Sequence, residues 1–131
     1  MENKYNEATT LRPEGDRVVD APMIRIDLPS FMEQIKHEAT WKNSDRNAIT
    51  IFKSKAMRLV LIALHSGAVM NAHTAIGILS VQVLEGRMKF SSALQNAELH
   101  KGQMLALHEG IPHSLTAVED TTFLLTLALC N

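Results

Sequence analysis

The sequence predicts an all-β fold, a single-domain β-barrel of jelly-roll type with a short N-terminal helix. From Asn47 onward, short apolar runs alternate with turn residues at a spacing of about 8 to 12 residues, which is typical of β-sandwiches and barrels. No later helical pattern is long enough for a β-α-β crossover, so we expect an antiparallel sheet. The length of 131 residues suits one domain with one hydrophobic core.

The chain divides into three predicted parts. Residues 1–20 contain few large apolar side chains and include Pro13 and Gly15, so we expect a flexible N-terminal arm. Residues 21–45 should hold a short strand and a helix that pack on the barrel. Residues 46–131 should form the barrel itself.

A helix is predicted within residues 27–41. Ser30 and Glu33 have the spacing of a capping box, which marks a helix N-terminus. Phe31 and Ile35 lie one turn apart and should share the apolar face of this helix.

The predicted strands follow one another with short turns between them. In the third run, Leu79, Val81 and Val83 share one face and should point into the barrel. Met88 and Phe90 should point inward in the next run, because they alternate with charged residues. In order, the runs read AITIFKS, MRLVLIALH, GILSVQVLE, RMKFSSA, AELH, QMLALHE, HSLTAV and TFLLTLAL.

Composition excludes several classes of partner. A net charge of −1 gives no general attraction for nucleic acids or acidic membranes. The apolar runs are too short to span a bilayer, and the first residues lack the apolar stretch of a signal peptide. Cys130 is the only cysteine, so no intrachain disulfide can form, and we expect a cytoplasmic protein.

Four histidines lie in two similar settings. ALHSG at residues 63–67 nearly repeats ALHEG at residues 106–110, which gives His65 and His108 the same local sequence. Each pentapeptide is followed by another histidine, His73 or His113. Imidazole is a common ligand of Zn, Fe and Ni, so these histidines are candidate metal or ligand-binding groups.

Residues 46–129 resemble the cupin superfamily, whose members are small RmlC-like jelly-roll barrels. The first cupin motif has the pattern G-x5-H-x-H-x3,4-E-x6-G, and the second has the pattern G-x5-P-x-G-x2-H-x3-N. The residues that match them are Gly67, His73, Gly86, Gly102, Gly110 and His113.

The departures from these motifs concern the metal ligands. The resemblance implies a site of three histidines and one glutamate in metal-binding cupins. This chain has Ala75 where the second histidine is expected and Leu79 where the glutamate is expected. Only His73 and His113 of the four ligands therefore remain. In the second motif, His108 stands where the proline is expected.

Three functions fit this pattern. The resemblance implies a fold but no particular reaction, so we assign no catalytic residue. The preferred prediction is a protein that binds a small, partly apolar ligand at the barrel mouth with no obligatory metal. The first alternative is a metal-dependent oxygenase or isomerase with Zn, Fe or Ni on His73, His113 and either His108 or His65. The second is an assembly or regulatory module with a vestigial pocket. The predicted ligand-binding residues are His73, His113, His108, Leu79, Val81, Met88 and Phe90.

A homodimer is the expected assembly. The helical residues 31–35, Trp41 and the outward-facing Ile78 and Leu84 offer more apolar surface than one small barrel needs. Twofold symmetric dimers are the commonest oligomers.

Overall fold

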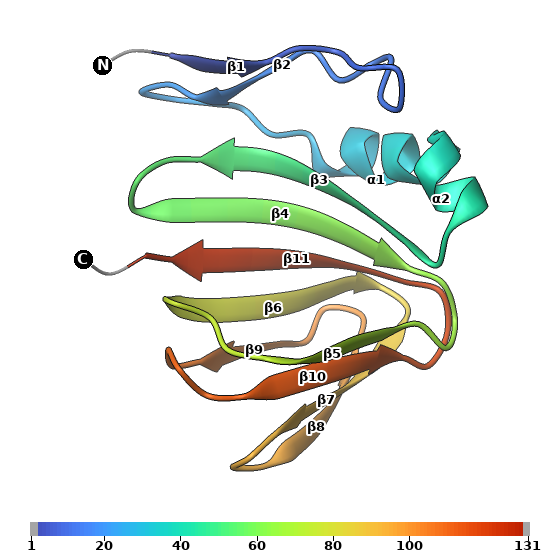
Figure 1. Ribbon diagram of the computed structural model, residues 1–131, viewed down its shortest axis with the longest axis vertical. Helices are drawn as coiled ribbons and strands as arrows, with labels where there is room; N and C mark the ends of the chain where they lie inside the picture. Colours follow the sequence, from blue (N-terminus) through green and yellow to red (C-terminus); the bar gives the residue numbers. More distant parts are fainter. Residues whose placement is uncertain (1–2, 130–131) are drawn as a thin grey trace.

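Two β-sheets stack face to face, and two short helices lie against the outside of the larger sheet (Figure 1). The computed structural model describes residues 3–129, apart from the side chains of residues 72 and 73. The larger sheet has the strand order β3-β4-β11-β6-β9, with β3 (Arg46–Lys53), β4 (Met57–Leu64), β11 (Thr121–Ala128), β6 (Ile78–Glu85) and β9 (Met104–Leu107). The smaller sheet has the order β5-β10-β7-β8, with β5 (Val69–His73), β10 (His113–Ala117), β7 (Arg87–Ser92) and β8 (Asn96–His100).

The observed strands confirm the predicted all-β jelly roll. Each of the eight predicted runs contains a strand, and every strand pairing in the described residues is antiparallel. Within the barrel, one further strand, β5, was not predicted. Its sequence VMNAH carries a polar Asn71 in its centre and gives no alternating pattern, so only its pairing with β10 defines it.

The interior of the barrel contains the predicted side chains. Leu79, Val81 and Val83 of β6 are buried between the sheets, where they meet Met88 and Phe90 of β7. The predicted inward faces of these two strands are therefore confirmed.

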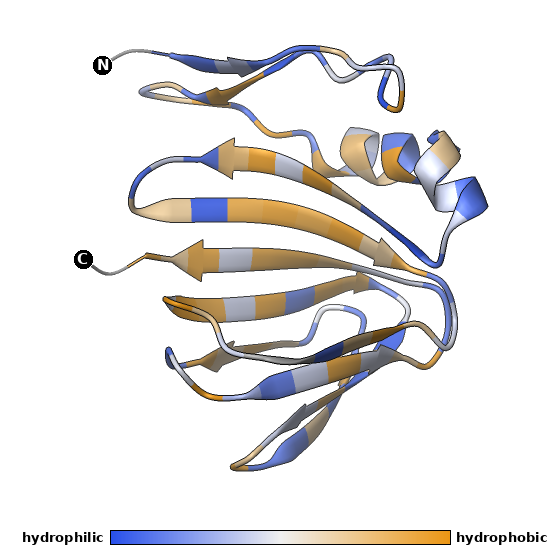
Figure 2. Ribbon diagram, in the orientation of Figure 1, coloured by the Kyte–Doolittle hydropathy of each residue, from blue (hydrophilic) through white to orange (hydrophobic). Residues whose placement is uncertain are grey.

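Strand β4 is apolar on both of its faces because both faces are covered. Ile62 and Leu64 point into the barrel, whereas Leu61 and Ala63 pack beneath the helices in a second cluster. Figure 2 shows β4 and β11 as largely hydrophobic along their length.

The predicted helix is two helices, α1 (Leu28–His37) and α2 (Ala39–Asn43), separated by the extended backbone of Glu38. The N-cap of α1 is Asp27, whose carboxylate accepts a hydrogen bond from Ser30 N at 3.2 Å. The predicted capping box at Ser30 is therefore wrong, because the helix begins earlier, at Leu28. No helix in the described part of the chain is long and apolar enough to cross a membrane.

The helices cover the outer face of β3 and β4. Ile35 is 0% exposed and Trp41 is 8% exposed, and both pack against Leu61 and Ala63. The prediction that this segment offers free apolar surface for a dimer is therefore wrong for Ile35 and Trp41, which the chain's own sheet buries, whereas Phe31 and Met32 are partly exposed.

The N-terminal segment carries two strands, β1 (Lys4–Asn6) and β2 (Arg17–Asp20), which pair with each other. Two arginines of this segment reach the rest of the chain. Arg12 forms an ion pair with Glu38 at 3.0 Å, and Arg17 donates to the Thr50 carbonyl at 2.8 Å. Residues 1–20 were expected to be a flexible arm, and the structure has a pair of strands within them. It places no strand within residues 21–45, where a short strand was expected beside the helix.

Candidate functional site

A cavity of about 340 Å³ lies between the two sheets at one end of the barrel. At this end β4 and β6 begin and β5 and β11 end, on the left of Figure 1. The lining residues come from both sheets and from the loop between β5 and β6. They are Arg58, Ile62, Met70, Thr74, Ala75, Ile76, Leu79, Val81, Phe90, His113, Leu115, Phe123, Leu125 and Leu127.

The register of β6 and β11 builds the apolar wall of this cavity. Leu79 lies directly opposite Leu127, and Val81 lies directly opposite Leu125. Because residues at every second position share a face, these four side chains point to the same side of the sheet. An apolar ligand surface would meet aliphatic groups along this wall.

His113 is the polar group set deepest in the cavity wall. It begins β10, is 5% exposed, and stacks on Phe90 with 5.5 Å between ring centroids. Its Nδ1 lies 2.9 Å from the Ile111 carbonyl oxygen. A carbonyl only accepts hydrogen bonds, so Nδ1 donates here, and Nε2 of a neutral ring is then an acceptor.

The structure brings some of the predicted site residues together at this cavity. His113, Leu79, Val81 and Phe90 line it. Met88 is fully buried in the core and does not line it. The backbone of His73 in β5 pairs with that of His113, but the His73 side chain lies outside the described residues.

The two histidines that were expected to replace a lost metal ligand do not reach the cavity. His65 stacks on Trp41 with 3.4 Å between ring centroids, and its Nε2 lies 2.8 Å from the Trp41 carbonyl oxygen. It follows the end of β4, whereas the cavity lies at the start of that strand. His108 is exposed and is absent from the lining.

The donor groups of the described residues do not fit a divalent metal centre. Among the described side chains, no group of three or more His, Cys, Asp or Glu residues could hold an ion. Ala75 and Leu79, at the positions of two cupin ligands, place apolar groups on the cavity wall. His73 and His113 would thus be two ligands, and protein metal sites of this type need three or four.

The main cavity residue that the sequence reasoning missed is Arg58. It lies on β4 two positions from Val60 and four from Ile62, so alternation alone places it on the inward face. The other missed residues are apolar or small, and they are Ile62, Met70, Thr74, Ala75, Ile76, Leu115, Phe123, Leu125 and Leu127.

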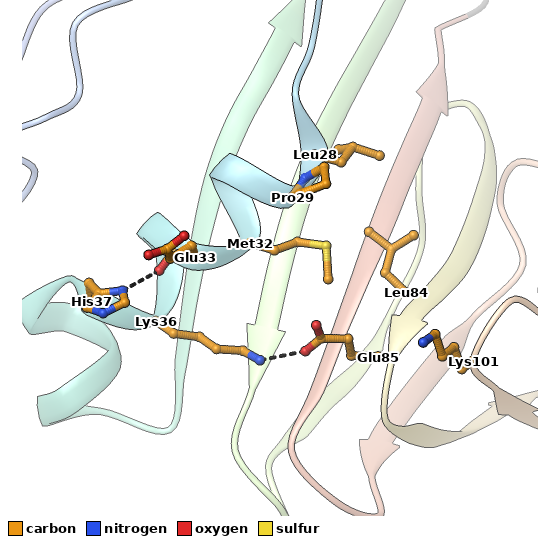
Figure 3. A pocket seen from close by; sticks show the side chains of 9 residues that line it. All are labelled: Leu28, Pro29, Met32, Glu33, Lys36, His37, Leu84, Glu85 and Lys101. Carbon is orange, nitrogen blue, oxygen red and sulfur yellow. Dashed lines mark hydrogen bonds and ion pairs between the residues drawn. The ribbon is translucent and has the colours of Figure 1, made fainter.

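A second hollow, of about 560 Å³, lies outside the barrel between α1 and β6. Figure 3 shows Lys36 and Glu85 pointing toward each other across it, and their Nζ and Oε2 atoms are 2.6 Å apart. Glu33 and Lys101 add one further charge of each sign. Its charges are balanced and its main polar contact is already made, so the barrel cavity is the better candidate site.

Comparison with known proteins identifies the fold. No protein-family model matches the chain, and no curated protein matches its sequence. A conserved protein of unknown function from Streptococcus pyogenes is 22% identical with a TM-score of 0.64, over 68% of this chain and 78% of that chain. A cupin-2 domain containing protein from Shewanella frigidimarina is 16% identical with a TM-score of 0.63, over 79% and 93%. Salicylate 1,2-dioxygenase from Pseudoaminobacter salicylatoxidans is 19% identical with a TM-score of 0.59, over 64% of this chain and 25% of the enzyme.

The architecture and these likenesses define a jelly-roll barrel with an internal cavity. More particularly, the chain has the cupin fold, as its two glycine and histidine motifs implied.

Proposed function

We propose that the protein binds a small, partly apolar molecule in the barrel cavity and needs no metal to do so. The cavity itself carries this proposal. Its volume of about 340 Å³ is at the lower end of the range of small-molecule sites, and its walls are apolar with a few polar groups. A vestigial pocket would be filled by side chains, whereas this one leaves room for a ligand.

The structurally similar proteins do not indicate which reaction, if any, this fold would catalyse here. One of them is a dioxygenase and another has no known function, and unrelated activities share this fold. The proposal therefore rests on the cavity of this chain, where the apolar Leu79 and Ala75 favour ligand contact over metal binding.

A matched pair of variants tests the proposal. A metabolite library is screened by thermal shift against the unchanged protein, and each hit is measured by calorimetry. Ala75→Phe places a phenyl ring at the cavity, so the hits should lose at least tenfold in affinity. Ala106→Phe makes the same change on the exposed face of β9, away from the cavity, and should leave binding unchanged.

Two results would contradict the proposal. The first is a library in which no compound stabilises the unchanged protein. The second is a set of hits that bind Ala75→Phe as tightly as the unchanged protein. Leu79→Phe serves as a second blocking variant, and the unliganded melting temperature of each variant shows that it is folded.

A cytoplasmic location and a homodimer remain part of this proposal. The single cysteine is consistent with a reducing compartment. With Trp41 buried, one apolar surface that a dimer could use is the outer face of β6 and β9, where Ile78 is partly exposed and Met104 is 56% exposed. Light scattering at micromolar concentration tests the dimer, and a monomer mass would contradict it.

A further inference from the structure

Arg58 is the one side chain of fixed charge among the described residues that line the barrel cavity. It shares the inward face of β4 with Val60 and Ile62, and it lies directly opposite Leu127 of β11. It is exposed and stands near the start of its strand. The guanidinium group is therefore at the open end of an apolar cavity.

The positive charge at this position has no counter-ion in the described part of the chain. Arg12, Arg46 and Arg87 each form an ion pair with a carboxylate, but no such pair involves Arg58. The residue directly opposite Arg58 in the β3–β4 pairing is Lys53, which also has no ion pair in the described part of the chain. Two cations side by side on adjacent strands repel each other, so an anion at this place would relieve the repulsion.

We propose, on the basis of the proposed function, that the ligand is a small monocarboxylate. Its acid group would meet Arg58 at the cavity mouth, and its apolar body would lie against Leu79, Val81 and Leu125. The planar guanidinium presents two parallel N–H donors that match the two oxygens of a carboxylate. At about 30 Å³ for each water-sized group, the cavity of about 340 Å³ holds roughly eleven such groups.

A panel of matched probes tests the charge and the size together. It consists of 3-phenylpropanoate, 3-phenylpropanamide, 3-phenylpropylamine and 2-phenylethylphosphonate, with octanoate and octanamide as a pair that has an unbranched body. Each probe is titrated calorimetrically into the full chain at low and at high salt. We expect at least one carboxylate to bind at least tenfold more tightly than its amide, and this advantage should shrink at high salt because the mouth is open to solvent.

Variants assign this preference to the guanidinium. Arg58→Gln should bring the carboxylate to the affinity of its amide and leave the amide unchanged. Arg58→Lys keeps the charge but loses the planar fork, so it should keep part of the preference. Arg25→Gln is the matched control, because Arg25 is exposed and does not line the cavity, and it should change nothing.

The outcomes separate this proposal from the proposed function. Amide, amine or phosphonate probes that bind as tightly as the carboxylates, or a carboxylate preference that survives in Arg58→Gln, would overturn the carboxylate assignment alone. The carboxylate assignment alone would also be overturned if no probe binds while a neutral library compound occupies the cavity. If neither the probes nor any library compound binds, both proposals fail.

Discussion

The attachment of the N-terminal segment to the barrel depends on the carboxylate of Glu38. This side chain is 6% exposed and sits at the break between α1 and α2. Arg12 Nε lies 3.0 Å from both of its oxygens, Asn47 Nδ2 lies 3.0 Å from Oε1, and Gln34 Nε2 lies 3.1 Å from Oε2. We therefore expect Glu38→Ala to destabilise the whole fold.

The size of the effect follows from these contacts. Removing one partner of a buried ion pair costs about 3–5 kcal/mol. Arg12 is 22% exposed and keeps a bond of 2.6 Å to the Ala48 carbonyl, so we expect the lower end, about 3 kcal/mol. With a urea m-value of about 2 kcal/mol/M, the unfolding midpoint should fall by roughly 1.5 M.

The same contacts predict a pH dependence. Burial raises the pKa of Glu38, but hydrogen bonds from Asn47, Gln34 and Arg12 outweigh this and hold the pKa below its ordinary value. A carboxyl with a lowered pKa stabilises the fold above the ordinary glutamate pKa of about 4.3, and this stabilisation is lost as the pH falls through the lowered pKa. The difference in unfolding free energy between the unchanged protein and Glu38→Gln should thus be full at neutral pH and shrink in acid.

Urea denaturation followed by circular dichroism measures both effects. Glu33→Gln is the control, because Glu33 is exposed on α1, which ends just before Glu38. Its unfolding midpoint should stay within about 0.25 M of that of the unchanged protein. The reasoning is refuted if Glu38→Ala unfolds at the same urea concentration as this control. It is refuted equally if the Glu38→Gln difference stays constant as the pH is lowered below the folded pKa of Glu38.

Three further predictions concern the core, a turn and the metal question. Ile35→Ala should cost about 3 kcal/mol in urea denaturation, since this side chain of α1 is fully buried against the larger sheet. An effect below about 1 kcal/mol would contradict that packing. Gly86 and Gly102 both have positive φ, but a Cβ at Gly86 would meet the Asp120 carbonyl and Thr121, whereas a Cβ at Gly102 would meet nothing within 4 Å. Gly86→Ala should therefore lower the melting temperature more than Gly102→Ala. Equal decreases in melting temperature would count against this turn geometry. Protein purified without a nickel column should hold well below one equivalent of Zn, Fe or Ni by elemental analysis, and one equivalent that disappears in His73→Ala would restore the metal-dependent alternative.

The fold could be predicted because the alternation of apolar and polar residues along each strand shows which side chains face the core and which face solvent. Alternation in β6 separates Leu79 and Val81 from Ser80 and Gln82, and burial follows it. The cavity could not be predicted in this way. Alternation places both Val83 and Leu79 inside, but only the register with β11 shows that Leu79, and not Val83, lies at the open end.

The two near-identical pentapeptides show the same limit most clearly. ALHSG begins with the last two residues of β4, and the pairing of Leu64 with Thr121 places it at the end of the barrel away from the cavity. ALHEG begins with the last two residues of β9, and the pairing of Leu107 with Leu79 places it at the cavity end. His108 thus has the right position along the barrel but the wrong face, since Leu107 packs on the core and the next side chain turns outward. Five identical or similar residues are too few to fix a strand's direction or its place in a sheet, so the same local sequence puts one imidazole on Trp41 and the other in solvent. Among the described residues that line the cavity, the fixed positive charge is that of Arg58, which suits an acid ligand better than a cation.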